Sequence, residues 1–317
     1  MRKLATAIFA TSLAVFGLVA PGPRVAPADA ATPSSIKVVL IVGPVAGSTS
    51  YYRSDADDAA AEARKYTSNV ITIYSPTATW SKVKPALQGA SIVVYMGHGN
   101  GSPSPYGPFN PDNVDGLGLN PSAGTNNSTT KYYGETFIGR DIRLAPNAVV
   151  ILGHLCYSAG NSESGNPDPT LGVAKQRVDN MAAGWIKAGA RSVVAEPYAG
   201  GMWGGAAWYI NQLFTTQQTM DAIFRSSQNF NNHILNFAST RSPGYTATMD
   251  PGHVNAPPFK RSIVGNPNLQ SAEVVGGRRA ASGTVVTDAT YPSSSPAFVS
   301  RRSVARPPAR SLVAGIR

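Results

Sequence analysis

Apolar residues in this chain gather in short continuous runs, separated by longer segments of mixed polarity. Five runs rich in β-branched residues occupy positions 36–43, 69–74, 91–99, 147–156 and 191–196. Strands that are covered on both faces of a sheet have this composition. The pattern therefore predicts five buried strands, and a sixth strand is expected within residues 259–269.

The segments between these runs have the spacing and the end charges of helices. SDADDAAAEARKY (54–66) begins with acidic residues and ends with basic ones, as a helix dipole favours. A long amphipathic helix is expected over 173–190, closed by Gly189. Shorter helices are expected within residues 79–90, 134–144, 203–214 and 219–229. The alternation predicts an α/β fold with a mostly parallel sheet and helices on both of its faces.

The segment from Asn100 to Tyr133 interrupts this alternation and is dominated by Gly, Pro, Asn and Ser. A segment of this length inside a domain is typical of a binding loop, a lid or a disordered loop. Its motif NPDNVDG brings Asp112 and Asp115 together, and a calcium site is one interpretation. The motif lacks the glutamate that completes an EF-hand loop, so a polar turn is the favoured interpretation. No other cofactor is expected.

The two ends of the chain differ in composition from its middle. Residues 1–30 have a basic start, an uncharged apolar stretch and a final Ala-Asp-Ala, which predicts a cleaved export signal rather than a membrane anchor. Residues 270–317 are rich in Pro, Ser, Ala and Arg without periodicity, which predicts a disordered tail. We therefore expect one domain over 31–269 in a protein that is secreted or associated with the cell envelope, with no membrane span after cleavage.

The formal net charge of +10 is concentrated in these ends. A basic protein ordinarily suggests a nucleic acid or another anionic partner. Because much of the excess lies in the signal and in the arginine-rich tail, little remains for the domain, and a nucleic-acid partner is not expected. Contact between the tail and an anionic cell envelope is one hypothesis, and a solvated tail without a partner is the other.

The only cysteine, Cys156, ends the fourth predicted strand, and His98 follows the third. A single cysteine excludes a disulfide within the chain, and a merely structural thiol is a liability in an oxidising compartment. Functional sites of parallel sheets form at the carboxyl ends of the strands. If the two strands are neighbours, the His98 imidazole can take the proton of an attacking Cys156 thiol. The backbone N–H groups of Gly99 and Cys156 are then candidate donors to the oxyanion.

Four short segments of the sequence resemble one known family. VVYMGHG (93–99) and VVILGHLCYSAG (149–160) are similar to the strand ends of the caspase-like cysteine peptidases, the group of caspases, legumains, clostripain, gingipains and CHAT-type domains. AAGWIKAGARSVVAE (182–196) and SIVGNPNL (262–269) are similar to later elements of the same group.

This resemblance implies a fold, an activity and residue roles. The fold would be the three-layer caspase-like fold, with a mostly parallel sheet between helices. The activity would be that of a cysteine endopeptidase, which cleaves a polypeptide substrate through a thioester acyl-enzyme. His98 would be the general acid and base, Cys156 the nucleophile, and the Gly99 and Cys156 amides the oxyanion donors.

Other interpretations of the same residues stay open. His154 lies two residues before Cys156, so on a strand both side chains would point the same way and could form a zinc or copper site with His98. The favoured interpretation of His154 is a buried, hydrogen-bonded residue or one that orients the dyad. Glu196 is a candidate for lining an acidic pocket that selects lysine or arginine. A catalytically silent binding module with the same fold, with Cys156 buried or turned from His98, is the remaining alternative.

Overall fold

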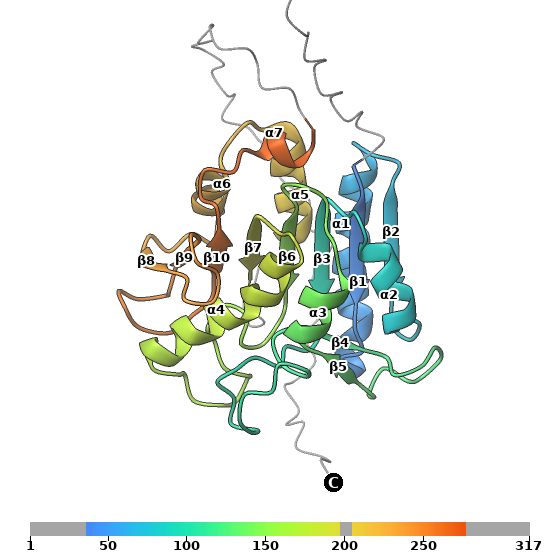
Figure 1. Cartoon of the computed structure of the whole chain (residues 1–317), viewed down its shortest axis with the longest axis horizontal. Helices are drawn as coiled ribbons and strands as arrows, with labels where there is room; N and C mark the ends of the chain where they lie inside the picture. The colour runs from blue at the N-terminus through green and yellow to red at the C-terminus, as the bar shows by residue number, and fades with distance from the viewer. Residues whose placement is uncertain (1–35, 197–204, 277–317) are drawn as a thin grey trace, which may run out of the picture. The chain divides into compact units, whose positions relative to one another are not determined.

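The described part of the chain, residues 36–196 and 205–276 of the computed structural model, is built around one eight-stranded sheet (Figure 1). Its strands are β1 (Val38–Val42), β2 (Val70–Tyr74), β3 (Ile92–Met96), β6 (Val149–Gly153), β7 (Ser192–Ala195), β8 (Leu235–Ala238), β9 (Thr246–Met249) and β10 (Ser262–Gly265). Their order across the sheet is β2-β1-β3-β6-β7-β10-β9-β8. The strands from β2 to β7 are parallel, and β10, β9 and β8 continue the sheet in antiparallel pairs. The predicted α/β class with a mostly parallel sheet is confirmed.

Helices cover both faces of this sheet and complete a three-layer arrangement. They are α1 (Thr49–Arg64), α2 (Trp80–Leu87), α3 (Glu135–Asp141), α4 (Leu171–Lys187), α5 (Gly205–Thr215), α6 (Met220–Ser226) and α7 (Ser271–Val274). Buried residues of α2, α3 and α4 share one apolar core with the sheet, and those of α1, α5, α6 and α7 share the other. This is the arrangement of layers that the caspase-like resemblance implies (Figure 1).

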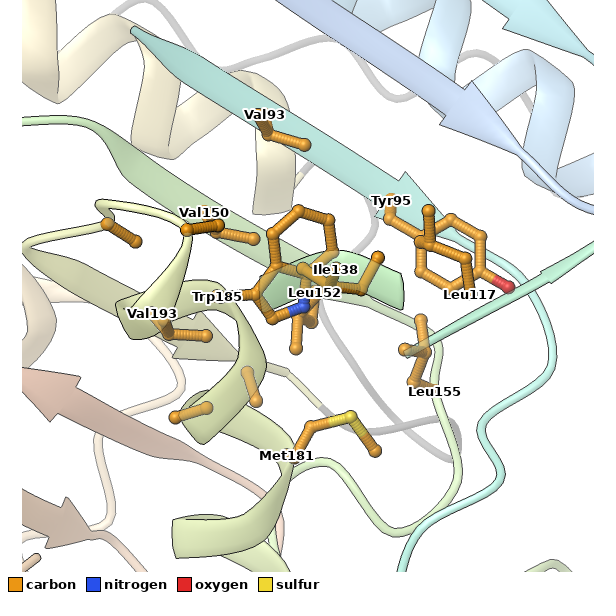
Figure 2. Packing of buried hydrophobic residues seen from close by; sticks show 14 of the residues in the cluster. Val93, Tyr95, Leu117, Ile138, Val150, Leu152, Leu155, Met181, Trp185 and Val193 are labelled. Carbon is orange, nitrogen blue, oxygen red and sulfur yellow. The ribbon is translucent and has the colours of Figure 1, made fainter. Parts of the chain in front are cut away.

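Each strand contributes alternate side chains to the two cores, as expected for a sheet that is buried on both faces. On β3, Val93 and Tyr95 face the α4 side, whereas Ile92 and Val94 face the α1 side. Trp185 of α4 is fully buried, and Figure 2 shows its indole packed beside Leu152 of β6. Burying a side chain of this size stabilises the fold by about 3 kcal/mol. The two cores therefore hold the ends of β3 and β6 in fixed positions.

The first helix begins earlier than the sequence predicts. The acidic residues of segment 54–66 suggest a start at Ser54, but α1 begins at Thr49 and has no acidic residue in its first turn. The Thr49 hydroxyl accepts a hydrogen bond from the Val45 N–H at 2.9 Å and donates one to the Ala46 carbonyl at 2.9 Å, so the first residue of the helix is tied to the 3-10 turn before it. Asp55 consequently lies within the helix and is buried, so its interpretation as a helix-start charge is wrong.

The segment from Asn100 to Tyr133 is folded onto the sheet. It contains a small two-stranded sheet formed by β4 (Leu117–Leu119) and β5 (Lys131–Tyr133). The Tyr95 hydroxyl of β3 accepts a hydrogen bond from the Gly118 N–H at 2.8 Å and lies 3.0 Å from the Gly118 carbonyl oxygen. Both strands contribute buried side chains to the α4-side core. The sequence shows the length and composition of this segment but not the hairpin within it.

The ordered domain extends past its predicted end at residue 269. Helix α7 follows directly, with a capping box between Gln270 and Glu273, and Val274 is buried beside α5. The tail therefore begins later than position 270. The export signal and residues 277–317, with the proposed envelope contact, lie outside the described residues. Among the described helices, none has the length and apolarity needed to cross a membrane.

Candidate active site

His98 and Cys156 follow two strands that pair directly. Strands β3 and β6 are parallel neighbours, with Met96 opposite Gly153 at their carboxyl ends. His98 comes two residues after Met96, and Cys156 three residues after Gly153. The prediction that the two strands are adjacent is confirmed, and both residues lie at the same edge of the sheet.

The two turns touch at Gly99 and Cys156. A Cβ atom added to Gly99 would overlap the Cys156 carbonyl oxygen and lie 2.8 Å from its carbonyl carbon and 2.9 Å from its nitrogen. Only a residue without a side chain allows the backbones to approach this closely. On the other side, the Tyr95 hydroxyl lies 3.1 Å from the His98 carbonyl oxygen and ties this turn to the strand below it. His98 thus directly precedes the glycine whose backbone touches the backbone of Cys156, the nucleophile candidate.

Cys156 sits in a sharply turned segment between two residues with left-handed backbone conformations. His154 has φ +59° and Tyr157 has φ +69°, a region that non-glycine residues rarely adopt. Leu155 and Tyr157 are buried in the α4-side core, and the Arg177 guanidinium covers the Tyr157 ring at 4.6 Å from its centroid. Cys156 itself is partly exposed. Its neighbours hold the backbone while its side chain reaches the edge of the core.

His154 points to the other face of the sheet. Its Nε2 lies 2.7 Å from Asp55 Oδ2 of α1, both side chains are buried, and its ring stacks on Tyr52 with 4.8 Å between centroids. Tyr52 belongs to the α1-side core, whereas Cys156 packs against the α4-side core. The expectation that His154 and Cys156 point the same way is therefore wrong, because His154 has left the strand geometry.

The position of His154 affects the hypothesis that His98, His154 and Cys156 bind zinc or copper. The His154 imidazole is engaged by Asp55, away from Cys156. Within the described residues, no group of three His, Cys, Asp or Glu side chains is arranged to hold a metal ion. The other interpretation of His154, a buried histidine satisfied by hydrogen bonds, agrees with its geometry.

Burial keeps both members of the candidate dyad neutral. It raises the pKa of the Cys156 thiol to about 12, and the nearby charge of Glu163 adds to the rise. Burial lowers the pKa of His98 below its ordinary value, against the opposing effect of Glu163. At neutral pH the Cys156 thiol is thus protonated and the His98 imidazole is unprotonated, the form in which a histidine can accept a proton.

Glu196 is placed differently from a free acidic residue in a pocket. Its carboxylate accepts hydrogen bonds from Tyr209 at 3.0 Å and from Arg261 at 3.1 Å, and all three side chains are buried. Arg261 also pairs with Asp250 at 3.0 Å. The Glu196 carboxylate is therefore part of a buried network between β7, α5 and β10 in which the Arg261 guanidinium serves two carboxylates, and burial raises the pKa of Glu196.

The two aspartates of the calcium hypothesis lie in unlike surroundings. Asp112 is exposed, and its N–H donates to the Asn110 side chain at 3.1 Å, as in a polar turn. Asp115 is fully buried; its N–H donates to the Asn100 carbonyl at 2.7 Å and its carboxylate accepts from the Ser102 N–H at 3.1 Å. Asp115 thus braces the segment that follows His98 and Gly99.

Asp115 should make the stability of the domain depend on pH. Burial raises its pKa to about 8, and Glu135 opposes its ionisation while Arg241 and the Ser102 N–H favour it. The pKa of an aspartate in the unfolded chain is about 3.9. At pH values between this pKa and the folded one, Asp115 is ionised in the unfolded chain and keeps its proton in the folded chain. The free energy of unfolding should therefore fall as pH rises from about 4 to about 8. Asp115→Asn should remove this fall. Between pH 4 and pH 8 the free energy of unfolding of the variant should therefore drop by about 2–5 kcal/mol less than that of the wild type.

Urea unfolding at pH 4, 6 and 8 measures this effect. Asp112→Asn is the matched control, because it makes the same change at an exposed neighbour. Equal pH slopes for wild type and Asp115→Asn would contradict a protonated Asp115.

Sequence reasoning missed Glu163 and Tyr106 at this site. The Tyr106 hydroxyl donates to Glu163 Oε2 at 2.6 Å, although 57 positions separate the residues. The Glu163 charge acts on His98 and on Cys156. The one signal available in the sequence is that Glu163 follows the nucleophile candidate by seven residues.

The described geometry thus brings His98, Gly99 and Cys156 together, leaves His154 and Glu196 in buried pairs of their own, and adds Glu163. No protein family, curated protein or solved structure matches the chain, so the case for a function comes from the residues of this site.

Proposed function

We propose that the protein is a cysteine endopeptidase that acts through His98 and Cys156. The observation that supports this most directly is the backbone contact of Gly99 with Cys156 at the carboxyl ends of paired strands. It places a partly exposed thiol and a histidine on two touching turns. Sites of mostly parallel sheets are expected at this edge.

The chemistry divides peptide hydrolysis into two steps. As Cys156 Sγ attacks the substrate carbonyl carbon, its proton passes to the neutral His98 imidazole. The tetrahedral intermediate then expels the amine, which takes the proton from His98 and leaves a thioester on Cys156. In the second step His98 accepts a proton from water, the hydroxide adds to the thioester, and the acid product leaves as Cys156 regains its proton.

The oxyanion of each step needs fixed donors. The amide groups of Gly99 and Cys156 lie side by side, and among the described residues neither donates to a backbone carbonyl outside a helix or strand. The Cys156 N–H acts on the Cys156 sulfur itself, so it lies near the reacting atom. This supports the donor role expected for them.

One observation favours a second candidate, a catalytically silent module with the same fold. Burial raises the pKa of the Cys156 thiol to about 12, which keeps it protonated and unreactive at neutral pH. In an active enzyme the His98 imidazole must take the thiol proton during the attack despite this high pKa. In a silent module no group takes it. Reactivity of the thiol separates the two candidates.

The test is cleavage of a peptide library by the purified protein before and after labelling with iodoacetamide. The peptidase proposal expects cleavage that is lost in proportion to alkylation of Cys156. An unreactive thiol without turnover would support the silent module. Cleavage that survives full alkylation, or that is lost only with a chelator, would refute the dyad and favour a metal-dependent hydrolase.

A further inference from the structure

A buried pair of histidine and aspartate lies directly before the turn that carries the nucleophile candidate. His154 Nε2 and Asp55 Oδ2 are 2.7 Å apart, and both side chains are buried. The pair joins the end of β6 to helix α1, and the proposed hydrolysis uses neither side chain. Taking two such groups out of water is costly, so a buried ion pair is weak evidence for a gain in stability. Stability alone therefore does not account for the pair.

Helix α1 holds the ring of His154 and its backbone. The Tyr52 ring stacks on the imidazole with 4.8 Å between centroids, and the Tyr51 ring meets it edge-on at 5.7 Å. The Tyr52 hydroxyl donates a hydrogen bond to the His154 carbonyl oxygen at 3.4 Å. With Asp55, three residues of one helix thus contact the imidazole, and one of them also contacts the main chain.

The helix that makes these contacts is itself fixed on the sheet. Asp55 directly precedes a face of α1 that is fully enclosed in the α1-side core and consists of Ala56, Ala59, Ala60 and Ala63. A side chain on a packed helix holds its partner more precisely than a side chain on a loop. Asp55 is therefore well placed to fix the position of the imidazole.

The backbone of His154 requires such a restraint. Its φ of +59° is unfavourable for a residue with a Cβ atom, and this conformation persists only where the surroundings impose it. The chain leaves β6 at this residue, and the next side chain, Leu155, enters the α4-side core. Cys156 follows at once, and its backbone touches Gly99. The turn at His154 thus sets where the Cys156 thiol lies.

We propose that Asp55 is a positioning residue for the hydrolysis at Cys156. Acting through the His154 imidazole, it holds the left-handed turn that places the nucleophile against the Gly99 turn. This inference rests on the proposed function and adds to it a residue that contacts neither the substrate nor the dyad. Because a carboxylate only accepts hydrogen bonds, the His154 Nε2–H is the donor, and the turn needs an acceptor at position 55.

The experiment changes this acceptor and measures kcat and KM separately on a peptide that wild type cleaves. Asp55→Leu has a similar volume but accepts no hydrogen bond, so kcat should fall about 10- to 100-fold while KM changes less than about threefold. Asp55→Asn keeps an acceptor oxygen and should retain kcat within about threefold of wild type. Asp57→Leu is the matched control, because it makes the same change at an exposed position of α1, and it should keep the wild-type kcat.

His154→Gly tests the same link from its other end. Glycine adopts the left-handed conformation without strain, so the chain can still turn although the tie to Asp55 is lost. The kcat of this variant should fall as far as in Asp55→Leu. The double variant should fall no further, because both changes remove one interaction. His154→Gly also carries the test alone if circular dichroism shows that Asp55→Leu does not fold.

The outcomes separate this inference from the proposed function. A wild-type kcat in folded Asp55→Leu or in His154→Gly would overturn the positioning role and leave the peptidase proposal intact. Losses that add up in the double variant, an equal loss in Asp55→Asn, or an effect on KM alone would overturn it in the same way. If wild type cleaves no library peptide, both proposals are overturned.

Discussion

Replacing Cys156 with alanine should abolish peptide hydrolysis and leave the fold intact. Loss of a covalent nucleophile typically lowers kcat by about 10⁴-fold or more. The side chain is partly exposed and lies at the margin of the α4-side core, so removing its sulfur leaves little unfilled volume. We expect the free energy of unfolding to change by less than about 1 kcal/mol. Cleavage rates and urea unfolding of the purified variant measure both effects.

His98→Ala should abolish hydrolysis equally, because the proposed mechanism passes the thiol proton to this imidazole. The residues act as a unit, so the double variant should be no slower than either single one. His253→Ala is the matched control, since it removes an exposed loop histidine. Full residual activity of either purified dyad variant would refute the peptidase mechanism.

The sheet and the position of the dyad could be predicted because both have local signatures. Strands such as β1 and β6 are fully buried and nearly uniformly apolar, which distinguishes them from the amphipathic helices between them. Since parallel strands present their carboxyl ends at one edge, the residues that follow β3 and β6 were expected to meet there. That expectation needs only the strand ends and their adjacency.

Other elements have no such signature. In β8 the exposed fraction alternates along Leu235–Ala238, and this four-residue strand at the sheet edge is too short to stand out. The pair of His154 with Asp55 joins positions 99 residues apart, and it depends on a left-handed turn at His154 that period-2 reasoning cannot foresee. The hydrogen bond of Tyr106 to Glu163 joins residues 57 positions apart, which composition alone does not specify.

Gly99→Ala should nearly eliminate activity although it touches neither side chain of the dyad. An added methyl group would overlap the Cys156 carbonyl oxygen and lie within 3 Å of two further backbone atoms of Cys156. Backbone cannot rotate away as a flexible side chain does, so the turns at His98 and Cys156 must move apart. A displacement of about 1 Å between reacting groups costs about 10²-fold in rate. The same shift would also displace the two proposed oxyanion donors from the substrate oxygen.

Gly172→Ala provides the matched control, because the same methyl group added near the start of α4 meets no atom within 4 Å. It should leave activity at the wild-type level, and alanine at a helical position should not weaken the helix. In Gly99→Ala we expect a fall in kcat/KM of about 10²-fold or more, together with a loss of about 1–3 kcal/mol in the free energy of unfolding. If Gly99→Ala instead cleaves peptides as fast as Gly172→Ala, the close approach of the two turns has no part in catalysis. The dyad would then have to reach its geometry through contacts other than this one.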